Sequence, residues 1–214
     1  ISADGHPVAG SLVFSVGTPS QRTIPPEVSA PTQRGLQVAI SAVQALVYLG
    51  MFLAVGLVIF RQLLLPTSTA TEGARASLLT VARRGADVGI AASLLMLPLT
   101  TINQSGDGLS ALFAARSWEV DLGNPEPVAA ILAVVGLALA VTTSAIRQVQ
   151  AALPLAGGAL ALGSLALVGH SRSFGPEPLV VATDVVHVLA GSVWFGGLVG
   201  LTIYTAHRRT LAAP

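Results

Sequence analysis

The sequence contains no cysteine and no lysine, and only 10% of its 214 residues are charged, against roughly 25% in an ordinary soluble domain. Without cysteine the chain has no disulfides, thiolate metal clusters or thiol catalysis. All 11 basic residues are arginines, no basic cluster is present, and the net charge is only +1. Nucleic acid is therefore a poor candidate partner.

Hydrophobic residues, in contrast, make up 52% of the chain, and its mean hydropathy is +0.74. This is more apolar surface than one core of this size can bury, so lipid is expected to solvate much of it. The sequence shows no phosphate-binding glycine loop, no GxSxG nucleophile elbow and no HExxH helix. We therefore expect a membrane protein that is not an enzyme.

The N-terminal part differs from the rest. The chain opens at Ile1 without the basic and apolar regions of a signal peptide, so we interpret this end as an internal cut. Residues 11–16 alternate in the period-2 pattern of a half-buried β-strand. Residues 18–34 contain four prolines among serine, threonine and glutamine, which is typical of an extended linker. Three parts are predicted, covering residues 1–17, 18–34 and 35–214.

Five apolar segments follow, each long enough to cross a hydrocarbon core of about 30 Å as a helix. They predict an all-α polytopic membrane bundle with spans at residues 35–60, 85–104, 127–146, 149–170 and 179–206. Small residues four apart, Gly85 with Gly89 and Gly196 with Gly200, would let neighbouring helices approach closely. Between the second and third spans, residues 109–118 fit either a short interfacial helix or an ordered loop.

The arginines predict how this bundle is oriented. With the N-terminus outside, seven arginines fall on the cytoplasmic side and four outside, which satisfies the positive-inside rule. Most acidic residues then fall outside, where they suit a protein that meets cations. We therefore predict a multi-pass protein of the cytoplasmic membrane with an extracytoplasmic N-terminus.

Ionisable residues inside the fifth span are the main candidates for chemistry. Asp184 and His187 are three apart, so they share one helix face, and His170 ends the preceding span. An ionisable pair at this depth is costly unless it lines a cation site or pathway. The alternative is that Asp184 only orients His187 and the pair locks helix packing. Imidazole with carboxylate suits Cu(II), Zn or Ni.

Methionine offers a second kind of metal ligand. Met51 and Met96 are the only two in the chain, and both fall inside predicted spans. They could pass Cu(I) through thioether contacts, but a single methionine on a helix is usually core filling. We therefore interpret both as packing residues.

Two stretches resemble known copper proteins. Residues 2–10, Ser-Ala-Asp-Gly-His-Pro-Val-Ala-Gly, with the strand that follows, resemble the C-terminal end of the CopC-type copper-binding β-sandwich. The resemblance implies Cu(II) ligation by Asp4 and His6. The fifth span, with His187 followed by Trp194-Phe195-Gly196-Gly197, resembles the CopD-type copper-resistance membrane domain, as does Gly169-His170. The CopC-like stretch precedes the CopD-like one, which is the order in CopC and CopD fusion proteins.

These resemblances imply copper binding and copper transport across the membrane, in the direction of uptake. Copper ions, the lipid bilayer and an extracytoplasmic copper chaperone are the implied partners, and copper is the implied cofactor. The metal candidates are Asp4, His6, His170, Asp184 and His187. Two rivals stay open: a haem-binding membrane redox protein of the b-type cytochrome kind, with His170 and His187 as axial ligands, and a structural membrane subunit without cargo.

Alanine at His187 tests the predicted cation pathway. If the imidazole is a ligand, His187→Ala abolishes copper accumulation by cells that carry the full-length protein. His207→Ala, at the predicted cytoplasmic edge, serves as the control and leaves accumulation unchanged. Unchanged copper accumulation in His187→Ala would remove this residue from the mechanism.

Overall fold

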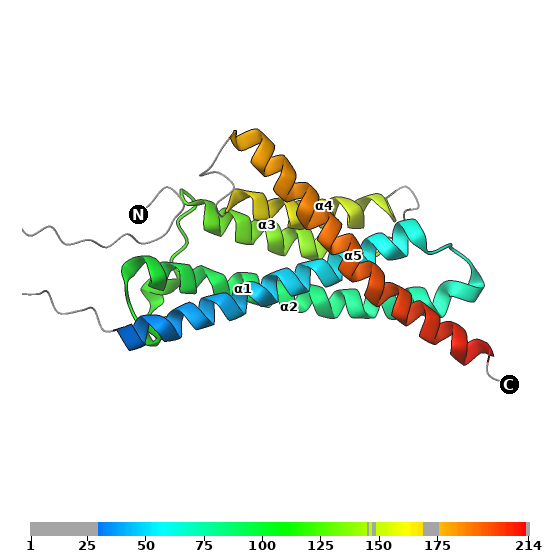
Figure 1. The fold of residues 1–214 in the computed structure, drawn as a ribbon, viewed down its shortest axis with the longest axis horizontal. Helices are drawn as coiled ribbons and strands as arrows, with labels where there is room; N and C mark the ends of the chain where they lie inside the picture. The colour runs from blue at the N-terminus through cyan, green and yellow to red at the C-terminus, as the bar shows by residue number, and fades with distance from the viewer. Residues whose placement is uncertain (1–29, 145, 147–148, 169–175, 213–214) are drawn as a thin grey trace, which may run out of the picture.

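The computed structural model describes residues 30–144, 146, 149–168 and 176–212. This part of the chain forms five α-helices (Figure 1): α1 (Ala30–Ile59), α2 (Glu72–Ser105), α3 (Pro125–Ala140), α4 (Ala152–Ser164) and α5 (Glu177–Ala212). These described residues contain no β-strand. The strand predicted at residues 11–16 lies outside them, and so does most of the predicted linker, although α1 already begins at Ala30 within it.

Short helical turns complete these elements. A π-helix, η1 (Phe60–Leu64), continues α1, and a 3₁₀ turn, η2 (Thr69–Thr71), precedes α2. Two 3₁₀ turns, η3 (Leu109–Phe113) and η4 (Ala115–Trp118), lie between α2 and α3, where the sequence allowed a short interfacial helix or a loop. A last 3₁₀ turn, η5 (Leu165–Leu167), extends α4.

Three helical segments of the described chain are long and apolar enough to cross a membrane, namely Arg34–Leu64, Thr69–Ser105 and Glu177–Arg209. The helix α3 has 16 residues, about 24 Å at 1.5 Å per residue, and α4 with η5 is similarly short. The prediction of five spans is therefore not confirmed. The protein is a helical membrane protein with three helices of spanning length and two shorter apolar ones.

Two helices have bounds that differ from the predicted spans, for identifiable reasons. The helix α2 begins at Glu72 rather than near residue 85, because its first turns are amphipathic and carry arginines that a hydropathy pattern counts against a span. The helix α3 ends at Ala140 rather than near residue 146, because a run of hydroxyl residues follows. Thr142 donates its hydroxyl to the carbonyl oxygen of Leu139 at 2.7 Å, which competes with continued helical bonding.

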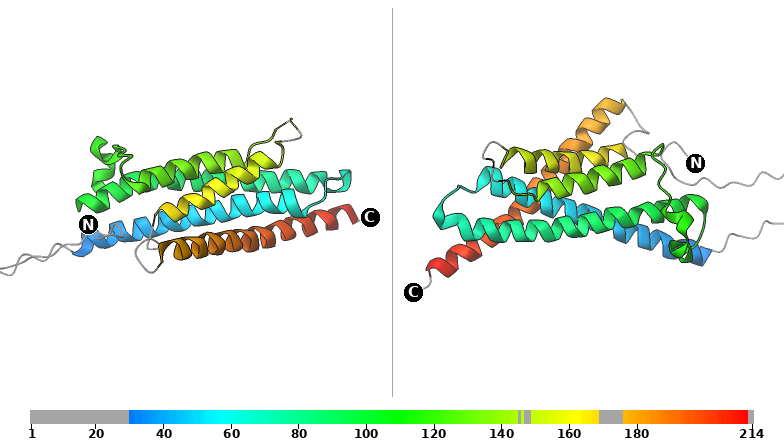
Figure 2. Two further views of the ribbon diagram at one scale, coloured as in Figure 1. Left: turned by 90° about the horizontal axis from the view of Figure 1, so that it is seen from above. Right: turned by 180° about the vertical axis from the view of Figure 1, so that it is seen from behind.

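The helix α1 is the centre of the bundle, since it contacts each of the other four helices. Figure 2 shows α5 along one side of the bundle, where it crosses α1 obliquely. The helices α3 and α4 pack mainly against each other and form a second pair beside α1 and α2. The main buried cluster joins residues of all four of these helices, including Met51, Leu99, Leu137 and Leu162.

Glycines determine how closely the helices approach α1. A Cβ built on Gly50 would lie 2.6 Å from the Cα of Gly89 on α2. One built on Gly56 would lie 2.8 Å from the Cα of Gly196 on α5. Neither position has room for any side chain, so the backbones are in direct contact, as expected for small residues at membrane helix interfaces. The prediction of close approach at Gly89 and Gly196 is confirmed.

A third backbone contact joins α3 to α4. A Cβ on Gly136 would lie 2.7 Å from the carbonyl oxygen of Gly157, and a Cβ on Gly157 would lie equally close to that of Gly136. The contact is therefore reciprocal. Each of the closely packed helix pairs α1–α2, α1–α5 and α3–α4 thus depends on glycine on both sides.

The connection between α1 and α2 is held by an arginine. The guanidinium of Arg75 donates to the carbonyl oxygens of Arg61, at 2.6 Å, and Leu65, at 2.9 Å. In return Arg61 donates its Nε to the carbonyl oxygen of Arg75 at 3.2 Å. Carbonyls at the end of a helix have no partner within it, and these bonds satisfy two of them.

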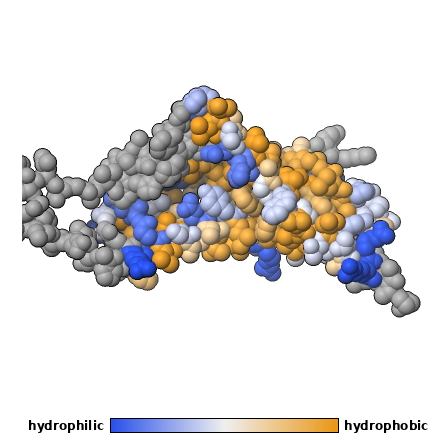
Figure 3. All heavy atoms as spheres, in the orientation of Figure 1, coloured by the Kyte–Doolittle hydropathy of each residue, from blue (hydrophilic) through white to orange (hydrophobic). Residues whose placement is uncertain are grey.

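The surface of the bundle differs between its middle and its two ends. Figure 3 shows hydrophobic residues over much of the middle of the face that carries α5, interrupted by a few hydrophilic patches, and further hydrophilic residues toward the two ends of the bundle. Several large apolar side chains of α5 are exposed, with Trp194 at 70% and Val186 at 65%. Such a surface fits a lipid environment rather than water.

Adjacent glycines of α5 test the role of backbone contact. Gly196→Ala is expected to destabilise the protein by about 1–3 kcal/mol, because the new methyl group overlaps Gly56 of α1. Gly197→Ala meets no atom within 4 Å and should be neutral or stabilising by up to about 1 kcal/mol. Thermal unfolding of both variants in detergent measures the difference. Equal unfolding midpoints would contradict glycine-dependent packing of α5.

Candidate functional site

The five residues predicted to bind metal divide into two groups. Asp4, His6 and His170 lie outside the described residues. Asp184 and His187 lie on α5, where Asp184 is half-buried and His187 is exposed. In the described part of the chain, no group of three or more histidine, cysteine, aspartate or glutamate residues is arranged to hold a metal ion. The ligand roles of these five residues stay predictions.

His187 lies among the apolar residues of α5 that the bundle leaves uncovered. Its neighbours Val186 and Leu189 are exposed, as is Trp194 one heptad further on. The side of α5 that packs on α1 instead carries Ser192 and Gly196, both buried. In the described structure His187 is therefore not enclosed between helices.

A cavity of about 340 Å³ lies elsewhere in the bundle, between α1, α2, α3 and the end of α4 with η5. Alanines of α3 and apolar residues of η5 form part of its wall. The side chains that carry heteroatoms are Gln44, Tyr48 and Met51 of α1, Ser93, Met96, Thr100 and Asn103 of α2, Glu126 of α3 and Ser164 of α4. A cavity of this size with a few polar groups has the character of a binding site.

The polar groups that line the cavity lie at different depths from the end of the bundle. The helices α1 and α2 run antiparallel and touch at Gly50 and Gly89. A hydrogen bond of 2.9 Å from Gln37 Nε2, near the start of α1, to Asn103 Oδ1, near the end of α2, confirms this register. Asn103 therefore lies toward the end of the bundle. Met96, seven residues earlier on α2, lies about 10 Å deeper.

The deeper part of the cavity holds the other methionine. Met51 adjoins the contact of Gly50 with Gly89, about another 10 Å beyond the level of Met96. Its side chain is 1% exposed, whereas that of Met96 is half-buried. The level of Ser93 falls between the two. From the bundle end, α2 therefore presents the Asn103 amide, the Thr100 hydroxyl, the Met96 thioether and the Ser93 hydroxyl, and the Met51 thioether of α1 lies deepest. The end that carries Asn103 is the polar end of the cavity.

Ser93 is unusual among the polar groups that line the cavity. Its side chain is 3% exposed, and its Oγ has no hydrogen-bond partner within the described structure. Ser164, on the opposite wall, is equally buried but donates to the carbonyl oxygen of Ala161 at 2.7 Å. A buried hydroxyl without a partner costs about 1–3 kcal/mol, which is typical of a position kept for a ligand or another function.

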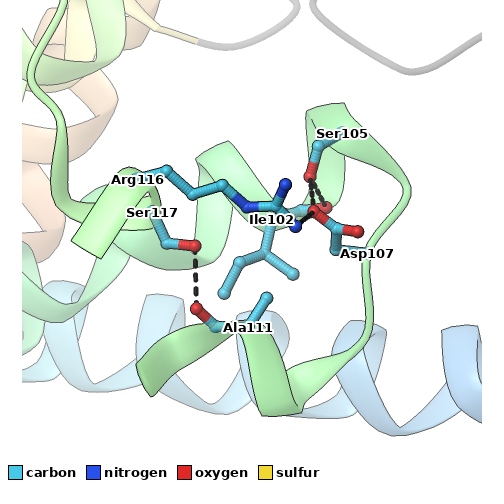
Figure 4. Close-up of polar contacts among 6 residues, drawn as sticks. All are labelled: Ile102, Ser105, Asp107, Ala111, Arg116 and Ser117. Atoms are coloured by element: carbon cyan, nitrogen blue, oxygen red, sulfur yellow. Dashed lines mark hydrogen bonds and ion pairs between the residues drawn. The ribbon is translucent and has the colours of Figure 1, made fainter. Parts of the chain in front are cut away.

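The segment that joins α2 to α3 is ordered beside the polar end of the cavity. Asp107 Oδ2 accepts hydrogen bonds from Ser105 Oγ at 2.8 Å and from Arg116 Nη2 at 3.1 Å, and Ser117 Oγ donates to the carbonyl oxygen of Ala111 at 2.8 Å (Figure 4). These bonds fix the turn between Asn103 and the start of α3. Glu126, in the first turn of α3, is half-buried at the cavity wall.

The fold defines a polytopic membrane protein, and its cavity carries polar groups among apolar ones. The family model of the copper resistance protein D-like N-terminal domain matches residues 35–175. The match covers most of the chain, which therefore belongs to this family, and copper resistance is the context of the family. No curated protein and no solved structure gives a significant match.

Of the residues that suggested the family, the match includes Gly169-His170 but not the motif on α5. It covers α1 to α4, whereas the sequence resemblance rested mainly on the histidine and glycines of α5. The resemblance to a CopD-type domain is thus confirmed at the level of the family. The CopC-type part is not shown by the match, which begins at residue 35.

Sequence reasoning missed the cavity because it considered each methionine alone. Met51 and Met96 were interpreted as core filling, yet both line the same cavity. A signal was present in the spacing, since Gln44 and Met51 lie seven apart on α1 and Met96 and Asn103 seven apart on α2. Only the antiparallel contact of the two helices shows that these stripes face each other.

The two cavity serines give a direct test of the unpaired hydroxyl. In metal-free protein, Ser93→Ala is expected to be neutral or stabilising by up to about 1–3 kcal/mol, since an unpaired buried polar group is removed. Ser164→Ala should cost about 1 kcal/mol, because a hydrogen bond is lost. Thermal unfolding in detergent measures both. If Ser93→Ala destabilises as much as Ser164→Ala, the Ser93 hydroxyl has a partner.

Proposed function

We propose that the protein transports copper across the cytoplasmic membrane, inward, with its N-terminus outside, and that it is a transporter rather than an enzyme. Membership of the copper resistance protein D-like family and the apolar helices support a copper-related membrane function. The observation that carries the proposal is the cavity, whose polar end lies at the end of the bundle that the arginine distribution assigns to the outside.

The topology supports this position of the cavity. The polar end is formed by the last turns of α2 and the first turn of α3, which belong to the same end as the start of α1. Arg61, Arg75 and the end of α5 lie at the opposite end, where His207 adjoins Gly73. Copper from outside would therefore meet Asn103 and Glu126 before it meets a methionine.

The charge near the entrance suits a cation. Glu126 lines the cavity, and no hydrogen bond or ion pair engages its carboxylate within the described residues. Glu119 and Asp121 lie exposed on the segment that precedes it, whereas Asp107 is paired with Arg116. Acidic groups around a low-dielectric cleft raise the local concentration of cations, so this end would gather copper ions.

The residues predicted from sequence enter this proposal as capture sites. Asp4 and His6, ahead of α1, would take Cu(II) outside the membrane, with an extracytoplasmic copper chaperone as the donor. His170, Asp184 and His187, before and on α5, offer imidazole and carboxylate ligands of the kind that bind Cu(II). Each of these roles is testable separately from the cavity.

Neutralising Glu126 tests the entrance. A unit charge about 8 Å away, through an effective dielectric constant of about 40, contributes about 1 kcal/mol, or about fivefold in cation occupancy. Glu126→Gln is therefore expected to lower the initial rate of copper accumulation about fivefold at limiting copper. The assay compares cells that express equal amounts of wild-type and variant protein.

The matched control is Glu119→Gln, which removes a carboxylate from the same connecting segment at an exposed position outside the cavity. It should change the rate by much less than Glu126→Gln. Equal loss in both variants would show that only the general surface charge matters. Failure of the wild-type protein to raise cellular copper above that of control cells would overturn the proposed transport.

A further inference from the structure

We propose that the thioethers of Met96 and Met51 are two successive Cu(I)-binding positions along the cavity, the first nearer its polar end and the second deeper. The choice of copper among soft monovalent metals rests on the proposed function. The two positions take copper that reaches the cavity already as Cu(I), so no change of oxidation state is part of this proposal. The positions themselves rest on the cavity and on the sulfur chemistry of the chain.

The donor chemistry selects the oxidation state. Thioether sulfur is a soft ligand that prefers Cu(I), whereas Cu(II) prefers imidazole and carboxylate. The chain has two methionines and no cysteine, so all of its sulfur is in Met51 and Met96. Both line one cavity of about 340 Å³. Methionines that only filled a core would leave few voids larger than a water molecule.

The directions of the side chains bring the two positions together. A side chain on an α-helix leans toward the N-terminus of its own helix. Because α1 and α2 are antiparallel, Met51 leans toward the level of Met96, and Met96 leans toward the level of Met51. The separation of about 10 Å between their backbone levels is therefore shortened at the sulfur atoms, which suits transfer from one thioether to the next.

Oxygen ligands are available between the two sulfurs. Ser93 falls between their levels, and its buried hydroxyl lacks a partner within the described residues. Tyr48 and Gln44 line the same section of the cavity from α1. A Cu(I) ion that moves from Met96 to Met51 would thus pass the one buried hydroxyl whose hydrogen-bonding capacity is unused in the described structure.

The test measures Cu(I) binding to the purified full chain in detergent, without oxygen and in competition with a chromophoric Cu(I) chelator. Copper K-edge X-ray absorption of the complex should show sulfur among the ligands, and that sulfur can only be methionine. In Met51→Leu with Met96→Leu the sulfur signal is lost and Kd rises at least about tenfold. Binding of Cu(II) should change little.

The variants preserve packing. Leucine and methionine are nearly equal in volume, and the exchange usually costs less than about 1.5 kcal/mol, which thermal unfolding checks. As a matched control, Leu78→Met is added to the double variant. Leu78 is fully buried in the cluster around Leu57 and Phe60 and does not line the cavity, so this sulfur should restore neither binding nor the absorption signal.

Copper accumulation by cells, compared with Cu(I) binding, distinguishes a failure of the methionine positions from a failure of the proposed transport. If the wild-type protein raises cellular copper, and the double variant accumulates as much copper and binds Cu(I) as tightly, the methionine positions are overturned and transport stands. Sulfur-ligated Cu(I) in a protein that does not raise cellular copper would overturn transport and leave the positions intact. A wild-type complex without sulfur ligation would overturn the two positions directly.

Discussion

Direct contact between helix backbones is the constraint on which the rest of the structure depends. At Gly50 with Gly89, Gly56 with Gly196 and Gly136 with Gly157, a single methyl group would already overlap the facing helix. In a bilayer the lipid tails are as apolar as leucine, so association depends on such close packing rather than on hydrophobic burial. These three contacts fix which residues of neighbouring helices share a level.

The cavity is a consequence of that geometry. Helices that touch at one point and cross at an angle move apart on either side of it, and the separation must be filled by side chains. Toward the end that carries Asn103, the wall opposite the methionines is built from alanines of α3. Small residues therefore serve two purposes here: they allow contact at the crossings and leave space between them.

Much of the fold could be predicted from sequence, because hydropathy and small-residue spacing are local signals. The membrane class, the helical bundle and the close approach at Gly89 and Gly196 all follow from them. Helix ends were harder to predict from hydropathy. The start of α2 at Glu72 depends on amphipathic turns, and the end of α3 at Ala140 depends on hydroxyl bonding. Hydropathy predicted five spans, and three helical segments among the described residues have spanning length.

The candidate site could be predicted only in part. The scarcity of histidine drew attention to His187, which is exposed on α5 in the described structure. The cavity joins residues far apart in sequence, such as Met51, Ser93 and Glu126, and each of them alone has an ordinary structural explanation. Their meeting depends on the register of antiparallel helices, which no single-helix pattern contains.

The bonds of Arg75 to the end of α1 have a consequence for biogenesis. Because they satisfy the carbonyls of the turn from within, α1 and α2 form a helical hairpin that can enter the bilayer as one unit. The helices α3 and α4, each short for a lone span, are joined by their own reciprocal glycine contact and suit entry as a second hairpin. Insertion in pairs would then precede the docking of α5.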